Sequence, residues 1–495
     1  MEIHWPLLLL ILTPFLIGLS GLLSRNRGTL DALQCGQAGI LVVSVILVAE
    51  EVLTSGPLSG LFYLHTDALS VWFSLILGIV GATGTLYGVG YVGEQLDRGA
   101  ISFKRFQRFF ILFDSYLAMM LLAVNVDNLG IMWIAIEGST LLAALLIGFE
   151  RNKGALEAGW KFVILSSVGI ALALFGTILV YYASENVMGV SEEALRWGVL
   201  HQVADQLNPE AMKLAFLFAL LGYGTKAGIA PMHTWLPDAH GEAPTPVSAM
   251  LSANMLTMAI YAILRFKILT DQAIGPLYTG NLLVGFGLFS VAISAIFLLT
   301  QQDFKRLFAY SSIEHMGIAL VGFGLGGVIG VFGGLWHLLN HALAKSAAFY
   351  GAGLVLLRHE HKIVDQVPGL LHGIPLAGVT FLIAGLALAG MPPFGLFISE
   401  VAIATDAFTR HPFIAYGFLL VLTLAFVTLL YQILRMVLGT PVEQKVLKLG
   451  QRCRSFATVA IAVNLGALTC IGLYVPPGLS DLLGTILALF GIPGK

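Results

Sequence analysis

Apolar runs of about 20 residues recur along the whole chain, and short polar or proline- and glycine-rich segments separate them. A run of this length crosses the hydrocarbon core of a bilayer as an α-helix. The sequence therefore predicts an all-α polytopic membrane protein. About fourteen spans are expected, at residues 5–23, 36–52, 68–92, 109–125, 127–149, 160–183, 212–231, 244–266, 280–300, 307–326, 328–357, 374–408, 413–438 and 455–475.

Three segments of the chain need a separate interpretation. The first run, Trp5–Leu23, has no basic segment before it and no small-residue cleavage site behind it, so it is predicted to be a membrane helix rather than a removable signal. The long, acidic connection Ser184–Lys213 is expected to carry a short surface helix. The apolar tail 479–491 is too short to cross.

Two of the spans are interrupted by proline. The seventh runs into "GTKAGIAPMHTWLPDAHGEAP" (224–244), and the twelfth contains "LALAGMPPFGLFISE" (386–400). Proline removes a backbone donor, and a helix broken inside the membrane needs protein or a polar cavity around the freed groups. Breaks at matching places in two halves are typical of transporters built from inverted repeats. We therefore expect two inverted five-helix repeats, each with one broken helix.

The same pattern predicts the division of the chain. Three N-terminal spans occupy residues 1–108, and the first repeat, spans 4–8, occupies residues 109–266. The second repeat, spans 9–13, occupies residues 276–439, and a C-terminal span and tail occupy residues 454–495.

Composition agrees with the membrane assignment. The 495 residues are 57% hydrophobic and only 11% charged, whereas a soluble domain is about 25% charged. A net charge of −2 offers no basic surface for nucleic acid. The three cysteines, Cys35, Cys453 and Cys470, form no CxxC pair, so neither an iron–sulfur cluster nor another metal or cofactor is expected.

Charge in the loops predicts the orientation. Most of the 26 Lys and Arg residues fall in loops that follow odd-numbered spans, and loops rich in these residues stay in the cytoplasm. The sequence therefore predicts that both termini lie outside the cytoplasm. Lys226 and Lys345 are the only basic residues that this assignment leaves within spans.

Ionisable residues near the middle of a span cost about 2.5–3.5 kcal/mol each to insert and usually mark an ion pathway. The candidates for proton transfer are Glu137, Lys226, His315, His337, His341, Lys345 and Glu400. A secondary set contains Asp114, Asp238, His240, Glu242 and Glu314. Within this set, Asp114 fits either a proton site or a helix-packing hydrogen bond. Asp238, His240 and Glu242 fit either an access path at the cytoplasmic end of the broken helix or a solvated loop.

His337, His341 and Lys345 follow one another at four-residue intervals in "LWHLLNHALAKSAAFY". This spacing places them on one helix face over about 12 Å. The row is predicted to carry protons through a polar interior, with structural hydrogen bonds as the alternative. Haem ligation is disfavoured because haem ligands in bundles usually come from different helices, and a zinc site lacks the HExxH pattern.

Lys226 and Glu137 have opposite charges in spans two helices apart. They are predicted either to form a buried ion pair or to control a proton, because a carboxylate that approaches or leaves a buried lysine changes the affinity of the lysine for its proton. Glu400 is expected to act in the same way on Lys345.

Several motifs resemble a known family. The segments "GTKAGIAPMHTWLPDAHGEAPTPVSAM", "DFKRLFAYSSIEHMG" and "NHALAKSAAFY", with the region of Glu400, resemble the antiporter-like subunits of complex I and its relatives. These relatives are the group 4 membrane-bound hydrogenases, formate hydrogenlyase and the multisubunit cation/proton antiporters. The forms "SSIEHMG" and "HALAKS" are most similar to the component F type of hydrogenase-4. The resemblance covers about residues 65–435.

The resemblance implies roles for individual residues. Glu137 and Lys226 match the family's glutamate in span 5 and lysine in span 7, and Glu400 matches the charged residue after the second break. The other matching positions are His315 in span 10 and His341 and Lys345 in span 11. Such residues form a hydrated axis that links two half-channels. One departure is that span 8 carries Ser252 and Thr257 where many members have a basic residue.

The resemblance also implies a function. We expect a proton-translocating subunit of a redox-driven complex in the cytoplasmic (inner) membrane, with other membrane subunits and a peripheral hydrogenase or dehydrogenase arm as partners. Because the sequence offers no ligands for a redox centre, electrons are expected to flow in those partners. The alternatives are a subunit of a sodium- or potassium/proton antiporter and a membrane partner of an inorganic-carbon uptake system.

Overall fold

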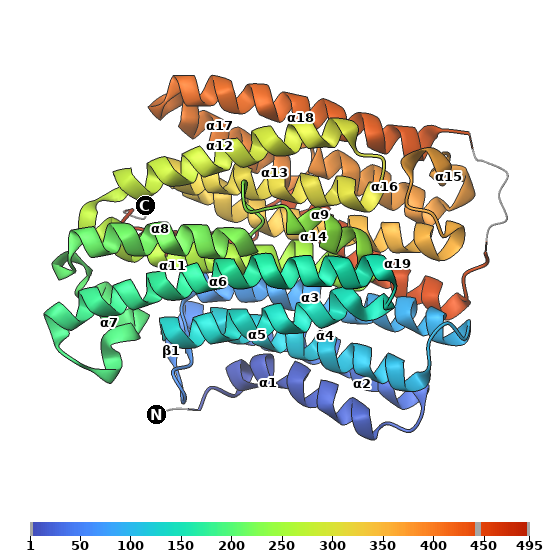
Figure 1. The fold of residues 1–495 in the computed structure, drawn as a ribbon, viewed down its shortest axis with the longest axis horizontal. Helices are drawn as coiled ribbons and strands as arrows, with labels where there is room; N and C mark the ends of the chain where they lie inside the picture. The colour runs from blue at the N-terminus through green and yellow to red at the C-terminus, as the bar shows by residue number, and fades with distance from the viewer. Residues whose placement is uncertain (1–2, 441–446, 493–495) are drawn as a thin grey trace.

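The computed structural model describes residues 3–440 and 447–492, and these residues are almost entirely helical. The first and last predicted units extend beyond this part, since residues 1–2 and 493–495 lie outside it. The long helices run roughly side by side (Figure 1). They are α1 (Trp5–Ser20), α2 (Arg27–Ser55), α3 (Ala68–Asp97), α4 (Phe103–Val124), α5 (Leu129–Ile147), α6 (Lys153–Met188), α8 (Pro209–Lys226), α11 (Leu256–Ile274), α12 (Pro276–Thr300), α13 (Phe304–Leu325), α14 (Val328–His359), α16 (Pro375–Leu388), α17 (Gly395–Arg410), α18 (Pro412–Leu438), α19 (Gln451–Leu473) and α20 (Pro477–Leu489).

Shorter elements connect the long helices. The helical ones are α7 (Trp197–Gln202), α9 (Trp235–Glu242), α10 (Thr245–Met250), α15 (Leu370–Gly373) and a π-helical turn at Leu251–Met255. Strands β1 (Leu58–Ser59) and β2 (His65–Thr66) pair antiparallel before α3. The helix α7 lies in the acidic connection between spans 6 and 7, where the sequence predicts a short helix.

Side chains of Asn, Asp and Ser cap the N-termini of many of the long helices. Each accepts hydrogen bonds from backbone N–H groups in the first turn, which have no partner inside the helix. The capping residues are Asn26, Asp67, Ser102, Asn128, Asn152, Asn208 and Asp303.

Among the described residues, ten helical segments are long and apolar enough to cross a membrane. Four predicted spans fall outside this set. Two are the broken pairs α8–α9 and α16–α17, and the other two, α13 and α14, carry several buried ionisable side chains. The polytopic all-helical architecture is therefore confirmed, whereas the count of fourteen is not.

The two helix breaks have the same local structure. Helices α8 and α16 both end in a Schellman cap, in which a glycine with positive φ follows the last turn. The glycines are Gly228 (φ 70°) and Gly390 (φ 65°), and a cis prolyl bond follows in both breaks. The amides of Ile229 and Met391 donate back across the cap to carbonyls of the preceding helix. This correspondence supports two five-helix repeats, and the division of the chain into repeats stays a prediction.

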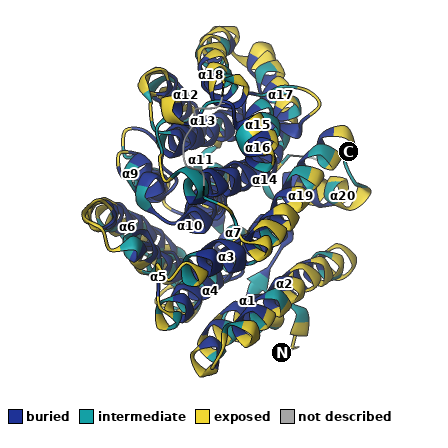
Figure 2. Ribbon diagram, turned by 90° about the vertical axis from the view of Figure 1, so that its right-hand side faces the viewer, coloured by how far each residue is buried: buried dark blue, intermediate teal, exposed yellow. Residues whose placement is uncertain are grey.

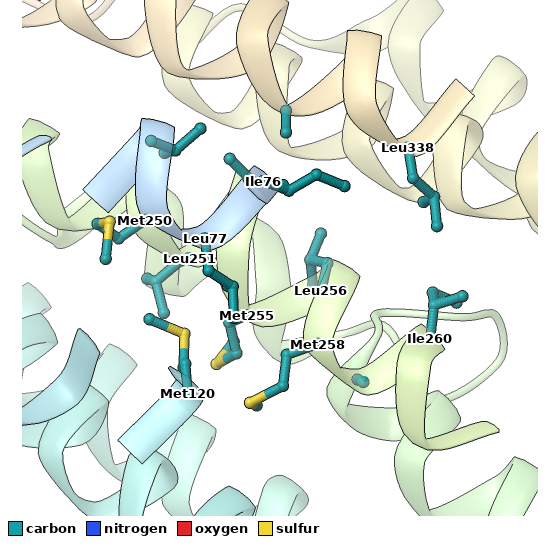
Figure 3. Close-up of a cluster of buried hydrophobic side chains, with 14 of the residues drawn as sticks. Ile76, Leu77, Met120, Met250, Leu251, Met255, Leu256, Met258, Ile260 and Leu338 are labelled. Carbon is teal, nitrogen blue, oxygen red and sulfur yellow. The ribbon is translucent and has the colours of Figure 1, made fainter. Parts of the chain in front are cut away.

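The span formed by α10, the π-helical turn and α11 lies at the centre of the molecule. All residues from 245 to 270 are buried, and exposed residues gather on the outer helices (Figure 2). Figure 3 shows the packing around this span, where Met255 and Leu256 lie among side chains from α3, α4 and α14. Because α11 packs on α8 and α10 packs on α14, this span connects the first broken helix to α14.

A buried ion pair links the start of α3 to α11. Two guanidinium nitrogens of Arg265 donate to the carboxylate of Asp67, each at 2.7 Å. Burial raises the pKa of Asp67, but the adjacent charge and hydrogen bonds of Arg265 outweigh burial and lower this pKa to about 2. The ionised carboxylate therefore stabilises the fold at neutral pH.

Asp67→Asn is expected to lower the free energy of unfolding by about 3 kcal/mol at pH 7, because Arg265 then keeps a buried charge without a counter-charge. A carboxyl with a lowered pKa in the folded state stabilises fully above its unfolded pKa of about 4 and loses this effect as the pH falls toward 2. The difference in Tm between wild type and variant should therefore shrink between pH 4 and pH 2. A constant difference over this range would contradict the assignment.

Candidate functional site

The lysine before the first break is buried between α5, α6 and α8. Lys226 is the last residue of α8 and is fully buried. Its Nζ donates to Thr140 Oγ1 on α5 and lies 5.3 Å from the centre of the Phe162 ring on α6. The C-terminal end of a helix carries partial negative charge, which favours an ammonium group at this position. The broken helix thus provides a site for a charge inside the protein.

Glu137 lies one helical turn before Thr140 on α5. No ion pair joins it to Lys226 in the described part of the chain, and its Oε2 is buried without a hydrogen-bond partner. Glu137 is nevertheless the carboxylate whose charge acts on Lys226. The arrangement therefore differs from a closed ion pair, and an unbonded carboxylate oxygen near Lys226 fits the predicted control of a proton.

The second buried lysine contacts α13. Lys345 Nζ on α14 donates to the backbone carbonyl of Phe308 on α13 at 2.7 Å. The carboxylate whose charge acts on it is Glu314 on α13, and Glu400 in turn lies close enough to act on Glu314. The expected action of Glu400 on Lys345 stays a prediction, and Glu314 is a further carboxylate that acts on this lysine.

All three side chains of the predicted row on α14 contact α13. His315 Nδ1 on α13 lies 2.9 Å from His337 Nε2, and its ring centre lies 5.0 Å from that of His341. Lys345 contacts the same helix, as described above. His337 Nδ1 lies 2.9 Å from Ser399 Oγ on α17. Three helices thus meet in a chain of hydrogen-bonded groups just after the second break.

This cluster also contains potential metal ligands. One ligand atom each from His315, His337 and Glu400 lies within 4.8 Å of the others, and all three residues are buried. The facing nitrogens of the two histidines are within hydrogen-bond distance of each other, which suits a proton relay.

His240 links the two halves, although the sequence places it equally well in a solvated loop. It is fully buried in α9, both its ring nitrogens lack hydrogen-bond partners, and its ring stacks on Phe349 of α14 at 5.2 Å. Lys305 and Lys345 are the cations whose charges act on it. The sequence contained a signal for this burial. His240 follows Leu236 by one helical turn, so it lies on the same helix face as an apolar residue.

The flanking acids lie nearer the surface. Asp238 pairs with Lys161 at 3.1 Å and with Arg306 at 3.0 Å, and Glu242 pairs with Lys362 at 3.0 Å. Asp238 and Glu242 line an open cavity of about 210 Å³. Asp238 and Glu242 share one face of α9 and His240 lies on the other, so the cavity reaches the helix that carries His240 without reaching its ring.

Span 8 carries hydroxyl side chains at the position where many family members have a basic residue. Ser252 lies in the π-helical turn, and its Oγ is 2.8 Å from Ser312 Oγ on α13. Thr257 donates to the carbonyl of Ala253 within its own helix. Buried basic groups where the halves meet therefore come from other elements, and His240 of α9 is one of them. Single π-helical turns often occur at functional sites.

Sequence analysis missed several buried cations, among them Lys305. Lys305 is 1% exposed and donates to the carbonyls of Gly241 and Ala243 at 3.2 and 2.6 Å. The sequence places it in a loop, but α13 begins at Phe304, before the predicted start of span 10. Lys226 and Lys345 are therefore not the only basic residues inside helices.

Asp114 lies apart from these groups, between α1, α2 and α4. It is fully buried and accepts hydrogen bonds from Gln34 at 2.8 Å and Gln37 at 2.9 Å. Gly18 of α1 packs so closely that a Cβ there would lie 3.0 Å from Asp114 Cβ. This geometry favours the helix-packing alternative over a proton site.

Asp114→Leu is expected to lower the free energy of unfolding by about 2–4 kcal/mol, because the amide groups of Gln34 and Gln37 lose their acceptors in a dry interface. The measurement is thermal unfolding of the purified protein in detergent. Asp114→Asn, which keeps an acceptor oxygen, is the control and should lose less. Equal stability of the leucine variant and wild type would contradict this role.

The sequence is similar to those of known membrane proteins. A family model described as "NADH:quinone oxidoreductase/Mrp antiporter, TM" matches residues 126–428. The chain is 40% identical over 383 residues to the hydrogenase-4 component F homolog of Methylacidiphilum infernorum (isolate V4), and the match covers 77% of this chain and 80% of that protein. The chain spans about half the length of the next curated relatives, 50% and 54%.

Two solved structures share the fold. A chain of an archaeal respiratory complex, the membrane-bound sulfane sulfur reductase, has a TM-score of 0.84 at 21% identity. A chain of the Mrp complex from Dietzia sp. DQ12-45-1b has a TM-score of 0.84 at 19% identity. Both matches cover 98% of this chain and 97% of the other. The two likenesses confirm the polytopic membrane fold.

Proposed function

Because this chain belongs to the NADH:quinone oxidoreductase/Mrp antiporter transmembrane family, we propose that it is a proton-translocating subunit of a redox-driven membrane complex of the hydrogenase-4 or complex I type. The observation that carries the proposal is a series of ionisable groups, all buried except the half-buried Glu137, that extends from α5 to α17. It consists of Glu137, Lys226, His240, Lys345, Glu314, His341, His315, His337 and Glu400.

Two cavities lie near members of the series. One is lined by Asp238 and Glu242 of α9, the helix that carries His240, and one of about 230 Å³ lies beside Glu400 between α16, α17 and α18. Water in such cavities would connect the regions of His240 and Glu400 to opposite sides of the membrane. The central groups are buried, so a proton there passes between side chains or confined waters.

Lys226 and Glu137 would control the first transfer. With the carboxylate close, Lys226 keeps its proton, and with the carboxylate withdrawn, the ammonium group in a buried site releases it. His240 would accept the proton, since neutral imidazole has a free nitrogen and both of its nitrogens lack other partners. Lys345 and the three histidines would carry it toward Glu400.

The driving force would come from partner subunits. Electron transfer in a peripheral arm would change the charge or position of groups at the interface with this chain and displace Glu137. The chain would lie in the cytoplasmic membrane, with its arginine- and lysine-rich helix ends in the cytoplasm and both termini outside. Reporter fusions at the two termini test this orientation.

A cation/proton antiporter is the second candidate, because the family includes Mrp subunits and a chain of an Mrp complex has the same fold. The experiment that separates the two uses the intact complex in sealed vesicles. We expect internal pH to change when a reductant is supplied in sodium- and potassium-free buffer. Proton movement that needs a sodium or potassium gradient and ignores the reductant would establish the antiporter instead.

A further inference from the structure

A cavity distant from the proton series opens where α4, α5 and α6 meet. Its volume is about 410 Å³. It lies at the ends of these helices, between the first turns of α4 and α6 and the turn that follows α5. The three helices are neighbours in the fold, and exposed residues cover the outer faces of α5 and α6 (Figure 2). The cavity therefore faces the surroundings of the protein rather than its interior.

Three arginines converge on this cavity, and no acidic side chain lines it. Arg105 donates to the carbonyl of Phe149 and stacks on its ring at 4.8 Å, while its Nε has no hydrogen-bond partner. Arg108 and Arg151 are exposed and form no ion pair within residues 3–440 and 447–492. Three positive charges near one cavity without a carboxylate create a site for an anion.

The remaining wall is apolar and faces outward along the helices. It includes Leu145, Leu156 and Trp160, which are 59%, 49% and 67% exposed, together with Leu112 and Val163. Tryptophan is enriched where membrane helices meet the headgroup region. The cavity therefore has a cationic end at headgroup level and an apolar flank that continues toward the hydrocarbon.

We propose that this cavity binds an anionic phospholipid. The phosphate lies among Arg105, Arg108 and Arg151, and the acyl chains lie along the leucine- and tryptophan-lined flank of α5 and α6. Basic pockets between membrane helices are suited to anionic headgroups. A free phosphate ion would use only the arginines, and a helix of another subunit would need carboxylates placed opposite them. Only a phospholipid satisfies the charge and the apolar wall together.

The test measures binding of phosphatidylglycerol to the purified complex, with phosphatidylcholine as the neutral comparison. Each basic residue near a headgroup contributes about 1 kcal/mol, so the double variant Arg108→Gln/Arg151→Gln should bind phosphatidylglycerol about 30-fold more weakly. Binding is read by native mass spectrometry of the intact complex. Arg435→Gln is the matched control, because Arg435 is an exposed cation on the distant helix α18. It should leave binding unchanged.

A second variant tests the contribution of the acyl-chain contacts separately from that of the headgroup. Val163→Trp fills the apolar flank and leaves all three arginines, so it should also weaken retention of phosphatidylglycerol. Unchanged binding in the arginine variant, or no preference over phosphatidylcholine, would overturn the proposal. So would displacement of the lipid by inorganic phosphate alone. Cross-linking of a partner subunit into the cavity would overturn it in favour of a protein interface.

Discussion

Lys226→Ala is expected to abolish redox-driven proton uptake while the complex still assembles. Removal of a proton-transferring group typically slows a step by about 10²–10⁴-fold, which in vesicles means a rate at background. The alanine also leaves Glu137 and Thr140 without their cationic neighbour, but the cap at Gly228 and the packing of α8 on α6 remain. The measurement is uptake by reconstituted vesicles with the intact complex, together with the amount of assembled complex.

Two further variants make this result specific. Lys213→Ala removes a half-buried lysine near the start of the same helix, where it pairs with Glu210, and should pump normally. Lys226→Arg keeps the positive charge but stays protonated under all working conditions, so it should be as inactive as the alanine variant. Full activity of the arginine variant would show that position 226 needs only a fixed charge, and the proposed release of a proton from Lys226 would be wrong.

His240→Phe is expected to interrupt transfer between the two halves. Phenylalanine can keep the stacked contact with Phe349 and fill the same buried space, yet it offers no nitrogen that binds a proton. Uptake should fall by about 100-fold or more, as for the loss of a general acid–base group. The fold should be retained, since neither ring nitrogen of His240 has a hydrogen-bond partner to lose.

The surface residue His372, which is exposed in α15, provides the control. His372→Phe removes a histidine in the same way and should leave uptake unchanged. Ser252→Ala tests the neighbouring route, since it removes one hydroxyl of the pair with Ser312, and should have a small effect. If His240→Phe pumps at the wild-type rate while Ser252→Ala does not, the link between the halves runs through the serine pair.

The membrane fold could be predicted from the sequence because the bilayer requires a certain length and an apolar composition of each span. The row on α14 could also be predicted, since helical periodicity places His337, His341 and Lys345 on one face. In the structure all three contact α13. Such properties depend only on neighbours along the chain. Partners across helices depend on which helices lie side by side, and for this reason the sequence did not identify Glu314 of α13 as a carboxylate that acts on Lys345.

The sequence by itself determined that this protein spans a membrane, contains two proline-broken helices and carries ionisable residues at mid-span positions. Only the tertiary structure decided which of these residues meet. It buried His240 between the halves, separated Asp114 from the series and placed Glu314 beside Lys345. The physical reason is that insertion into a bilayer selects each helix for its own composition, whereas an electrostatic contact is set by the packing of helices that are distant in the chain.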